Sequence, residues 1–328
     1  MSVGFGFLGA GMVARVAVGP AVAATPGARL VAAASLSPDR AAALGAGRVH
    51  ARYTDLLDDA DVDVVYVALR TGDHARWALA ALEAGKNVLV EKPLGTSAAD
   101  VAAIAATAEA SGRWAVEAAW WRWHPRTAAL LAGLREGRVG APRRLDAGFT
   151  FALDPAPAWR WRPGGGGALL DVGCYAATAL LAAAGAALDI HAGDVEVSVR
   201  DAQVTPTVAG VDATTRADLE LGGVAARLVA SFTGPGRQWL VVQGDAGRVA
   251  LGVGEAFTSW REPAGLWWDG PTGASVELTP AVDAYALMVG DVAAAVREGR
   301  RPGVDGTESA AVATLLDKVA ARAARPHT

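Results

Sequence analysis

Asp171 and Tyr175 are the residues whose types and spacing most clearly suggest chemistry. They stand four positions apart in GGGGALLDVGCYAATAL, residues 164–180, which reads as a glycine run followed by a helix. Side chains four apart lie on one face of a helix, one turn from each other. A run of glycines lets the backbone approach a ligand that a side chain would block. We therefore interpret this segment as one wall of a ligand site, with ordinary core packing of Tyr175 as the alternative.

A lysine in the segment VEKPLG is the second candidate for chemistry. Lysine occurs only at positions 86, 92 and 318 of a chain with 30 lysines and arginines. Lys92 and its neighbour Glu91 follow an apolar run, at the end of a predicted strand where ligands of doubly wound folds bind. A desolvated lysine exchanges protons, which arginine does not do in proteins, and an adjacent ammonium lowers the pKa of a tyrosine. Lys92 is thus a candidate partner for Tyr175.

The N-terminal segment GAGMVA has the spacing G-x-G-x-x-A at a predicted strand-to-helix turn. Glycines at such a turn permit close approach of a pyrophosphate to the start of the helix. The expected cofactor contacts here are Gly9, Gly11, Met12 and Val13. An ordinary tight turn is the alternative interpretation.

The end of the second predicted strand bears on the choice of dinucleotide. An NAD site usually presents an acidic residue there, whereas this chain reads ASLSPDRA and offers Ser35, Leu36 and Arg40. A hydroxyl with a nearby guanidinium suits a 2′-phosphate better than two ribose hydroxyls. We therefore expect NADP(H) to be preferred, with NAD(H) possible, and a solvated Arg40 as the alternative.

Apolar runs alternate with alanine-rich helical segments over the first half of the chain, which predicts a parallel sheet covered on both faces. The expected strands are Val3–Leu8, Leu30–Ala34, Val62–Leu69, Asn87–Val90 and Trp114–Ala118, and the expected helices are Met12–Ala24, Arg40–Leu44, His74–Ala84 and Ala98–Ser111. This pattern is typical of an α/β, Rossmann-type dinucleotide-binding domain, which we place at residues 1–120.

The pattern changes after about Trp120. A helix at Pro125–Glu136 precedes alternating segments such as TRADLEL, ARLVASF, QWLVVQGD and RVALGV, and helices at Pro280–Arg297 and Thr307–Ala324 close the chain. Alternation predicts a large, mostly antiparallel open sheet with one face free or turned to a partner. We place this α+β domain, for substrate binding and oligomerisation, at residues 121–328.

Composition excludes several classes of protein. The net charge of −4 and the pI of 5.8 give no general attraction for nucleic acid or anionic membranes. The longest uncharged run, 172–188, is short for a membrane span. The N-terminus carries no basic leader, and a single cysteine, Cys174, suits a reducing compartment. We expect a cytoplasmic protein that binds neither nucleic acid nor membrane and has no metal site.

Together, GAGMVA, AGKNVLVEKPLG, GGGALLDVGCY and the later YALMVGDVAAAV resemble the glucose-fructose oxidoreductase / inositol dehydrogenase / rhizopine catabolism (Gfo/Idh/MocA) family of NAD(P)-dependent oxidoreductases. The resemblance extends over nearly the whole chain. It implies that Lys92 lies beside the nicotinamide and the substrate, with a cis bond to Pro93. The family's D-x-G-x-H motif appears as Asp171, Gly173 and Tyr175, with tyrosine in place of histidine.

The resemblance also implies further contacts. Where many members read A-T-P-N-x-x-H after the third strand, this chain reads Ala68, Leu69, Arg70 and Thr71 and keeps His74. The expected catalytic residues are Lys92, Tyr175 and Asp171. The cofactor residues implied in addition to those above are Leu69, Arg70, Thr71, His74, Glu91, Lys92, Trp161, Arg162 and Tyr285. The expected substrate residues are Arg122, His124, Asp171 and Tyr175. For His124, which precedes Pro125, a capping or core histidine is an equally favoured alternative.

These expectations indicate an NADP-dependent oxidoreductase that moves a hydride between the nicotinamide and a sugar carbonyl or alcohol. The segment WRWRPGGGGALLDVGCY is similar both to reductases of nucleotide-linked 3-ketosugars and to aldose or anhydrofructose oxidoreductases. Arg160 and Arg162, which precede the glycines, would suit a diphosphate, and this favours the first group slightly. A non-catalytic NADP-sensing protein is the alternative from another class. We expect a homodimer or homotetramer formed through the C-terminal sheet.

Overall fold

The computed structural model describes residues 2–154, 159–271, 273–304 and 306–325. Two compact units form, one from Met1–Trp123 with Asp283–Gly306 and the other from His124–Val282 with Thr307–Thr328. The domain boundary expected at residue 120 therefore did not include residues 283–306, which belong to the first unit. This return places helix α8 (Ala284–Glu298) against α1, β1 and β2 of that unit, because α8 carries an apolar face that needs a partner.

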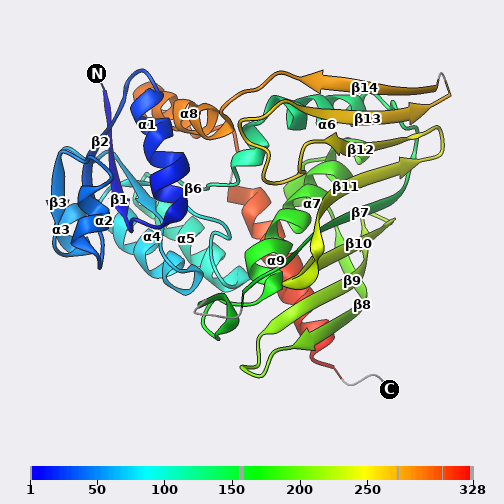
Figure 1. Cartoon of the computed structure of the whole chain (residues 1–328), viewed down its shortest axis with the longest axis horizontal. Helices are drawn as coiled ribbons and strands as arrows, with labels where there is room; N and C mark the ends of the chain where they lie inside the picture. The colour runs from blue at the N-terminus through cyan, green and yellow to red at the C-terminus, as the bar shows by residue number, and fades with distance from the viewer. Residues whose placement is uncertain (1, 155–158, 272, 305, 326–328) are drawn as a thin grey trace. The chain divides into compact units, whose positions relative to one another are not determined.

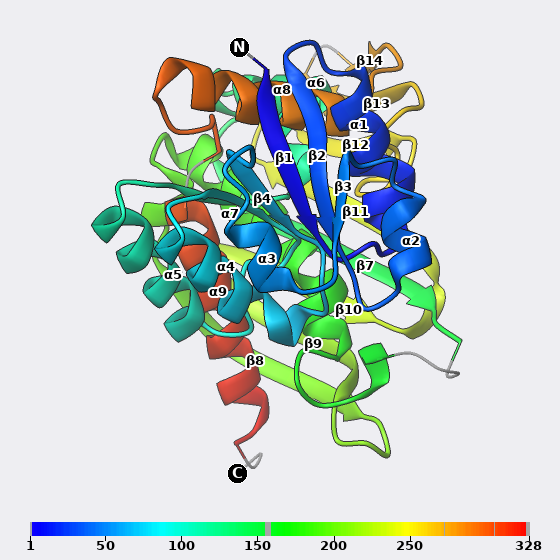
Figure 2. The same ribbon diagram turned by 90° about the vertical axis from the view of Figure 1, so that its left-hand side faces the viewer.

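A six-stranded parallel sheet forms the centre of the first unit, as the sequence predicted. Its strand order is β3-β2-β1-β4-β5-β6, and Figure 2 looks onto this unit. Every residue of β1, β4 and β5 is buried, which explains their uninterrupted apolar sequences. The strands are β1 (Val3–Leu8), β2 (Ala28–Ala34), β3 (Arg48–His50), β4 (Val64–Val67), β5 (Asn87–Val90) and β6 (Ala115–Glu117).

The helices of the first unit lie close to their expected positions. The stretch expected as one helix at 12–24 contains a π-helical turn, Ala14–Val18, that runs into α1. The short β3 and α3 were not anticipated. Besides α8, the α-helices are α1 (Gly19–Ala24), α2 (Pro38–Ala42), α3 (Tyr53–Leu57), α4 (His74–Glu83) and α5 (Ala98–Ala110).

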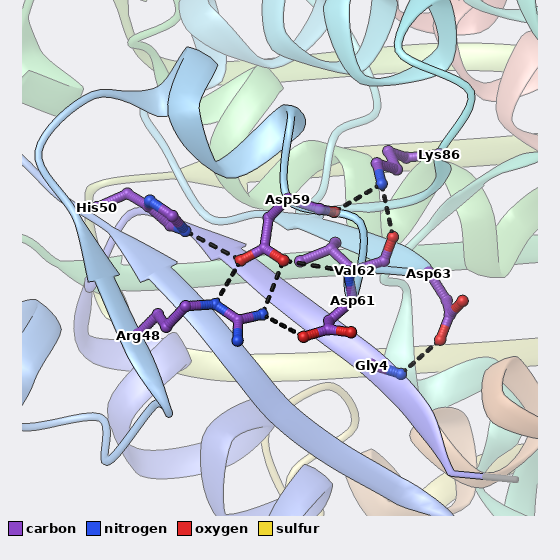
Figure 3. A network of polar contacts seen from close by, with 8 residues as sticks. All are labelled: Gly4, Arg48, His50, Asp59, Asp61, Val62, Asp63 and Lys86. Carbon is purple, nitrogen blue, oxygen red and sulfur yellow. Dashed lines mark hydrogen bonds and ion pairs between the residues drawn. The ribbon is translucent and has the colours of Figure 1, made fainter.

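A polar network ties the edge strand β3 to the segment before β4 (Figure 3). The Asp59 carboxylate accepts hydrogen bonds from Arg48 Nε (2.8 Å) and Nη2 (2.7 Å), and His50 Nε2 lies 3.0 Å away. The bonds from Arg48 hold the pKa of this carboxyl well below its usual range. Lys86 donates to the carbonyl oxygens of Asp59 and Val62 at 2.8 and 2.9 Å, so this lysine has a structural role.

The second unit is built on an eight-stranded sheet of order β14-β13-β12-β11-β7-β10-β9-β8. Only the β7–β10 pair is parallel, and the other neighbours are antiparallel, which confirms the expected mostly antiparallel sheet. The strands are β7 (Pro142–Ala152), β8 (Val197–Pro206), β9 (Asp212–Leu221), β10 (Val224–Ser231), β11 (Thr233–Gly244), β12 (Arg248–Val253), β13 (Ala264–Gly270) and β14 (Gly273–Thr279).

Three helices cover one face of this sheet, namely α6 (Pro125–Arg135), α7 (Cys174–Leu188) and α9 (Gly306–Ala323), as Figure 1 shows. Among the described residues, Leu169–Leu188 is the one helical stretch long and apolar enough to cross a membrane, and 89% of its most apolar window is buried in the protein. This stretch is the core helix of the unit. No helix of the described chain covers the opposite face of the sheet.

Candidate functional site

The turn after β1 has two glycines, Gly9 and Gly11, which differ in backbone conformation and in the space around them. Gly9 has φ of 96°, and a Cβ there would lie 2.3 Å from the Ala68 oxygen, so the fold itself requires glycine. At Gly11 the nearest atom to an added Cβ, beyond its chain neighbours, is that same oxygen at 3.9 Å. The protein's own packing therefore leaves space at Gly11 that suits the close approach of a pyrophosphate. Met12 beside it is 65% exposed.

The end of β2 presents no carboxylate at its tip, as expected. The Ser35 hydroxyl is half-buried and accepts a hydrogen bond from the Ser37 amide at 3.2 Å. Leu36 is 94% exposed, and Arg40 is exposed on α2. Asp39 lies in the first turn of that helix. These residues fit the adenosine phosphate of NADP(H), with an exposed guanidinium available for the 2′-phosphate.

His74 supports the loop between β4 and α4 from beneath. Its ring is 1% exposed, with Nδ1 2.8 Å from the Pro93 oxygen and Nε2 3.2 Å from the Leu69 oxygen. Burial lowers its pKa and keeps it neutral, so the ring donates to only one of the two carbonyls. Thr71 is 3% exposed. Direct cofactor contacts expected of His74 and Thr71 conflict with this burial, whereas Arg70 is exposed.

Lys92 follows β5 and is half-buried. The expected cis bond between Lys92 and Pro93 is confirmed. Glu91, also half-buried, accepts a hydrogen bond from the Tyr66 hydroxyl at 2.6 Å, which anchors the strand end to β4. Lys92 thus lies at the same sheet edge as the glycine turn, because the carboxyl ends of parallel strands meet there.

In the second unit, Asp171 lies in a π-helical turn, Leu169–Gly173, that leads into α7. Such turns are frequent at functional sites. Its side chain is 8% exposed and forms an ion pair with Arg160, whose Nε lies 2.8 Å from the carboxylate. Arg160 therefore pairs with Asp171 through Nε, while its side chain stays 36% exposed, and a contact to a diphosphate remains a prediction. Arg162 remains exposed, and Tyr175 is half-buried in the first turn of α7.

Aromatic rings surround Tyr175, a feature that the sequence did not reveal. The ring centroids of Phe149 and Phe257 lie 5.7 and 5.6 Å from that of Tyr175. Phe149 also packs on Phe151 at 5.8 Å. Phe257 is fully buried, whereas Tyr175 and Phe151 are partly exposed. Two phenylalanines therefore fix the tyrosine ring, and an exposed ring continues the same apolar surface.

Two glycines of the run 164–167 lie so close to other atoms of the protein that they leave no space for a side chain. A Cβ at Gly166 would lie 2.2 Å from the Arg162 oxygen, and one at Gly167 would lie 2.1 Å from Asp212 Oδ1. Gly167 also has φ of 106°. Local backbone and the Asp212 carboxylate thus account for these two glycines, whereas a Cβ at Gly164 would meet nothing within 4 Å. Room for a substrate beside the run stays a prediction.

Asp212, at the start of β9, holds the beginning of the helix that carries Asp171 and Tyr175. Its Oδ2 accepts hydrogen bonds from the Leu169 amide and the Thr215 hydroxyl, both at 2.7 Å. Burial raises the pKa of this carboxyl. A carboxylate at a helix N-terminus is stabilised by the free amide groups there. Sequence reasoning missed Asp212 because it is distant along the chain.

The residues expected on the substrate side behave differently from one another. His124 is 1% exposed, and its Nδ1 accepts a hydrogen bond from the Arg126 amide at 3.0 Å, so it caps α6. Burial and the neighbouring Arg126 charge lower the pKa of His124 to about 4. His124 thus has the capping role that was the alternative to a substrate contact. Arg122 is half-buried, with its guanidinium 5.7 Å from the Trp121 ring centroid.

Trp161 and Tyr285 were expected to contact the cofactor. Trp161 donates from Nε1 to the Asp154 oxygen at 3.1 Å and packs edge-on against Phe232 at 5.1 Å. Tyr285, in α8 of the first unit, is 6% exposed and lies 5.5 Å from the Trp120 ring. Both rings have packing roles, and a cofactor contact from either stays a prediction. Within the described residues, no His, Cys, Asp and Glu side chains gather as a metal site.

The candidate cofactor residues lie mainly in the first unit, and Asp171 and Tyr175 lie in the second. The first unit gathers the glycine turn, the end of β2 and Lys92 at one edge of a parallel sheet, which is how dinucleotide oxidoreductases hold their cofactor. Residues 3–118 match the family model described as oxidoreductase family, NAD-binding Rossmann fold, and residues 127–250 match the GFO/IDH/MocA C-terminal domain. The chain belongs to the GFO/IDH/MocA family of oxidoreductases.

Similar proteins include sugar dehydrogenases and reductases. The chain is 34% identical to D-xylose 1-dehydrogenase (NADP(+)) 2 of Haloferax volcanii, over 96% of this chain and 95% of that protein. It is 34% identical to dTDP-3,4-didehydro-2,6-dideoxy-alpha-D-glucose 3-reductase of Streptomyces violaceoruber, over 92% and 89%. The structure of a 3-ketoreductase of Actinomadura kijaniata with NADP and TDP-benzene matches with a TM-score of 0.88 and 29% identity, over 98% of both chains.

Proposed function

We propose that this protein is an NADP-dependent reductase of a nucleotide-linked 3-ketosugar. The observation that carries the proposal is the joint presence of Lys92 after β5 and of Tyr175 four residues after Asp171, in a fold similar to the 3-ketoreductase over 98% of both chains. An aldose dehydrogenase is the second candidate, favoured by the similarity to the xylose enzyme along nearly the full chain.

The residues would divide the work as follows. The turn at Gly9 and Gly11 would hold the pyrophosphate, and Ser35 with Arg40 would hold the 2′-phosphate. NADPH would supply the hydride to the ketone carbon. Tyr175 would donate the proton to the ketone oxygen, and the ammonium of Lys92 would polarise that oxygen and ease loss of the tyrosine proton.

Asp171 would act by position. Its ion pair with Arg160 fixes the carboxylate in the π-helical turn at the start of the helix, one turn before Tyr175. The Phe149 and Phe257 rings limit the directions that the tyrosine ring can take. A preorganised proton donor costs no reorganisation when the oxygen develops charge.

Exchange of Tyr175 for phenylalanine tests the proposal. Tyr175→Phe removes one hydroxyl and keeps the ring packing, so kcat should fall by about 10²- to 10⁴-fold while NADPH affinity stays the same. Lys92→Arg should lose nearly as much, since guanidinium does not share a proton and places its charge differently. The assay follows NADPH absorbance with a panel of TDP-linked ketosugars and free aldoses.

The panel separates the candidates. Turnover of free aldoses alone would favour the dehydrogenase, and NADPH binding without turnover of any sugar would favour a sensor. Full activity of Tyr175→Phe on the best substrate would contradict the assigned role.

We further propose a cytoplasmic homodimer joined through the uncovered face of the eight-stranded sheet. Trp268 packs against Gly133 of α6, so its neighbour Trp267 points to the uncovered face. Arg248 stacks on the Trp267 ring at 4.4 Å and pairs with Asp269 at 3.4 Å. A half-buried tryptophan among charges of both signs suits a self-complementary, isologous interface. Light scattering that gives the monomer mass would contradict this.

A further inference from the structure

Arg126 carries a buried positive charge that the proposed mechanism does not use. Its side chain lies in the first turn of α6 and is 2% exposed. Nη1 donates to the Val253 oxygen at 2.9 Å, and Nη2 donates to the oxygens of Glu255 and Ala256 at 3.2 and 3.0 Å. Burial lowers the pKa of Arg126 to about 10, which leaves it charged at neutral pH. A buried charge held by carbonyls alone is costly, so its presence here calls for a physical reason.

The three carbonyls belong to one segment, residues 253–259, which starts at the last residue of β12 and leads toward β13. A loop is normally exposed, because its backbone groups need water, yet Ala256 and Phe257 here are fully buried. Gly254, Glu255 and Thr258 are exposed, whereas side chains replace the water around the buried residues. Besides Arg126, the Gln238 Oε1 accepts from the Phe257 amide at 2.7 Å, and the Ser259 hydroxyl accepts from the Glu255 amide at 2.7 Å. Arg126 thus holds the first half of a loop that is folded inward.

Phe257 of this loop packs against Tyr175. The Phe257 ring lies 5.6 Å from the Tyr175 ring, with an angle of 30° between their planes, and 6.1 Å from Phe149, which also contacts Tyr175. A continuous set of contacts therefore runs from the guanidinium of Arg126 through the loop backbone to the tyrosine. All of these residues lie in the second unit.

We propose that Arg126 is a positioning residue, which sets the place of the Tyr175 ring by holding the 253–259 loop inward. The proposal rests on the proposed function in so far as Tyr175 transfers the proton. Loss of Arg126 would remove the guanidinium donors of three carbonyl oxygens, and the loop would move outward to reach water. Tyr175 would then lose the ring that supports one of its sides, and its hydroxyl would spend less time in reach of the substrate oxygen.

The experiment compares Arg126→Met with Arg126→Lys and with Arg135→Met. Arg135 is exposed on the same helix, so its exchange is the matched control. Kinetics normalised to the folded, NADPH-binding fraction should give Arg126→Met a kcat lower by roughly 10- to 100-fold, since displacements of about 1 Å cost that much. The Kd of NADPH should not change. Arg126→Lys should recover part of kcat, and Arg135→Met should match the wild type.

Fluorine NMR on protein labelled with 3-fluorotyrosine gives a readout that is independent of catalysis. The Tyr175 signal, assigned by its loss in Tyr175→Phe, should shift or broaden in Arg126→Met and stay in place in Arg135→Met. Wild-type kcat together with an unmoved signal in Arg126→Met would overturn the proposal. If Arg126→Met does not fold, Phe257→Leu carries the same test, because it removes the ring that links the loop to Tyr175.

These readouts separate the two proposals. Full activity of Tyr175→Phe, combined with a moved fluorine signal in Arg126→Met, would refute the proposed function and leave the positioning of Tyr175 standing. An inactive Tyr175→Phe with an unmoved signal and unchanged kcat in Arg126→Met would refute only the positioning role. A uniform loss of stability in Arg126→Met, without any change in kcat per folded molecule, would show a structural role and would also overturn it.

Discussion

Exchange of Gly11 for alanine should impair cofactor binding without impairing folding. The added Cβ would meet nothing closer than the Ala68 oxygen at 3.9 Å, an ordinary contact, and Gly11 does not adopt positive φ. The free energy of unfolding should therefore change by no more than about 0.5 kcal/mol, or rise slightly because the unfolded chain loses freedom. A methyl group in the path of a pyrophosphate should raise the Kd of NADPH about tenfold or more, which is about 1.4 kcal/mol.

Two other glycines make the comparison sharp. Gly9→Ala should lower the free energy of unfolding by at least about 1–2 kcal/mol. The φ of 96° at this position strains any side chain, and the added Cβ would lie 2.3 Å from the Ala68 oxygen. Gly290, in α8 of the same unit, has its nearest neighbour for a Cβ at 4.0 Å. Gly290→Ala should leave both folding and NADPH affinity intact, and it serves as the control.

Urea denaturation followed by circular dichroism gives the stabilities, and NADPH fluorescence titration gives the affinities. The reasoning fails if Gly11→Ala binds NADPH as tightly as the wild type. It fails equally if Gly11→Ala is as unstable as Gly9→Ala, since the space beside Gly11 would then serve the fold and not a ligand.

Two further outcomes follow from the first unit. Ser35→Asp should abolish or reverse a preference for NADPH over NADH, because a carboxylate repels the 2′-phosphate and accepts from ribose hydroxyls; equal wild-type Kd values for NADPH and NADH would contradict this. Asp59→Asn should lower the urea midpoint at neutral pH, and its gap from the wild type should shrink as the pH falls below about 4. The pKa of Asp59 is lower in the folded protein than in the unfolded chain, so the ionised carboxylate stabilises the fold at pH values above the unfolded pKa. This stabilisation is lost as the pH falls through the folded pKa. A difference between the two midpoints that persists in strong acid would contradict the argument.

The sequence predicted the parallel sheet well because each of its central strands is a buried apolar run. Val3–Leu8 and Asn87–Val90 were predicted with their observed bounds. The edge strand Arg48–His50 was missed, since it has three residues, of which two are exposed, and the Asp59 network holds it in place. The placement of α8 was also beyond local reasoning, because it depends on packing partners near the N-terminus.

Local motifs identified where the candidate site lies, whereas pairings within it came only from the structure. The glycine turn and Lys92 depend on residues next to each other in sequence. Arg160 with Asp171, and Arg126 with the loop at 253–256, join side chains to partners that no spacing rule connects. Burial likewise separated His124 from the residues that remain candidates for substrate contact.

Glycine occurs for different physical reasons in the two glycine-rich segments. At Gly167 the protein's own Asp212 carboxylate occupies the place of a side chain, so this glycine serves the start of the helix that carries Tyr175. At Gly11 no atom of the protein within ordinary contact distance requires glycine, which leaves space for the proposed pyrophosphate. Gly167 therefore belongs to the support of the helix that carries the tyrosine. Tyr175 and Phe151, the partly exposed rings of the aromatic cluster, offer an apolar surface to the proposed substrate.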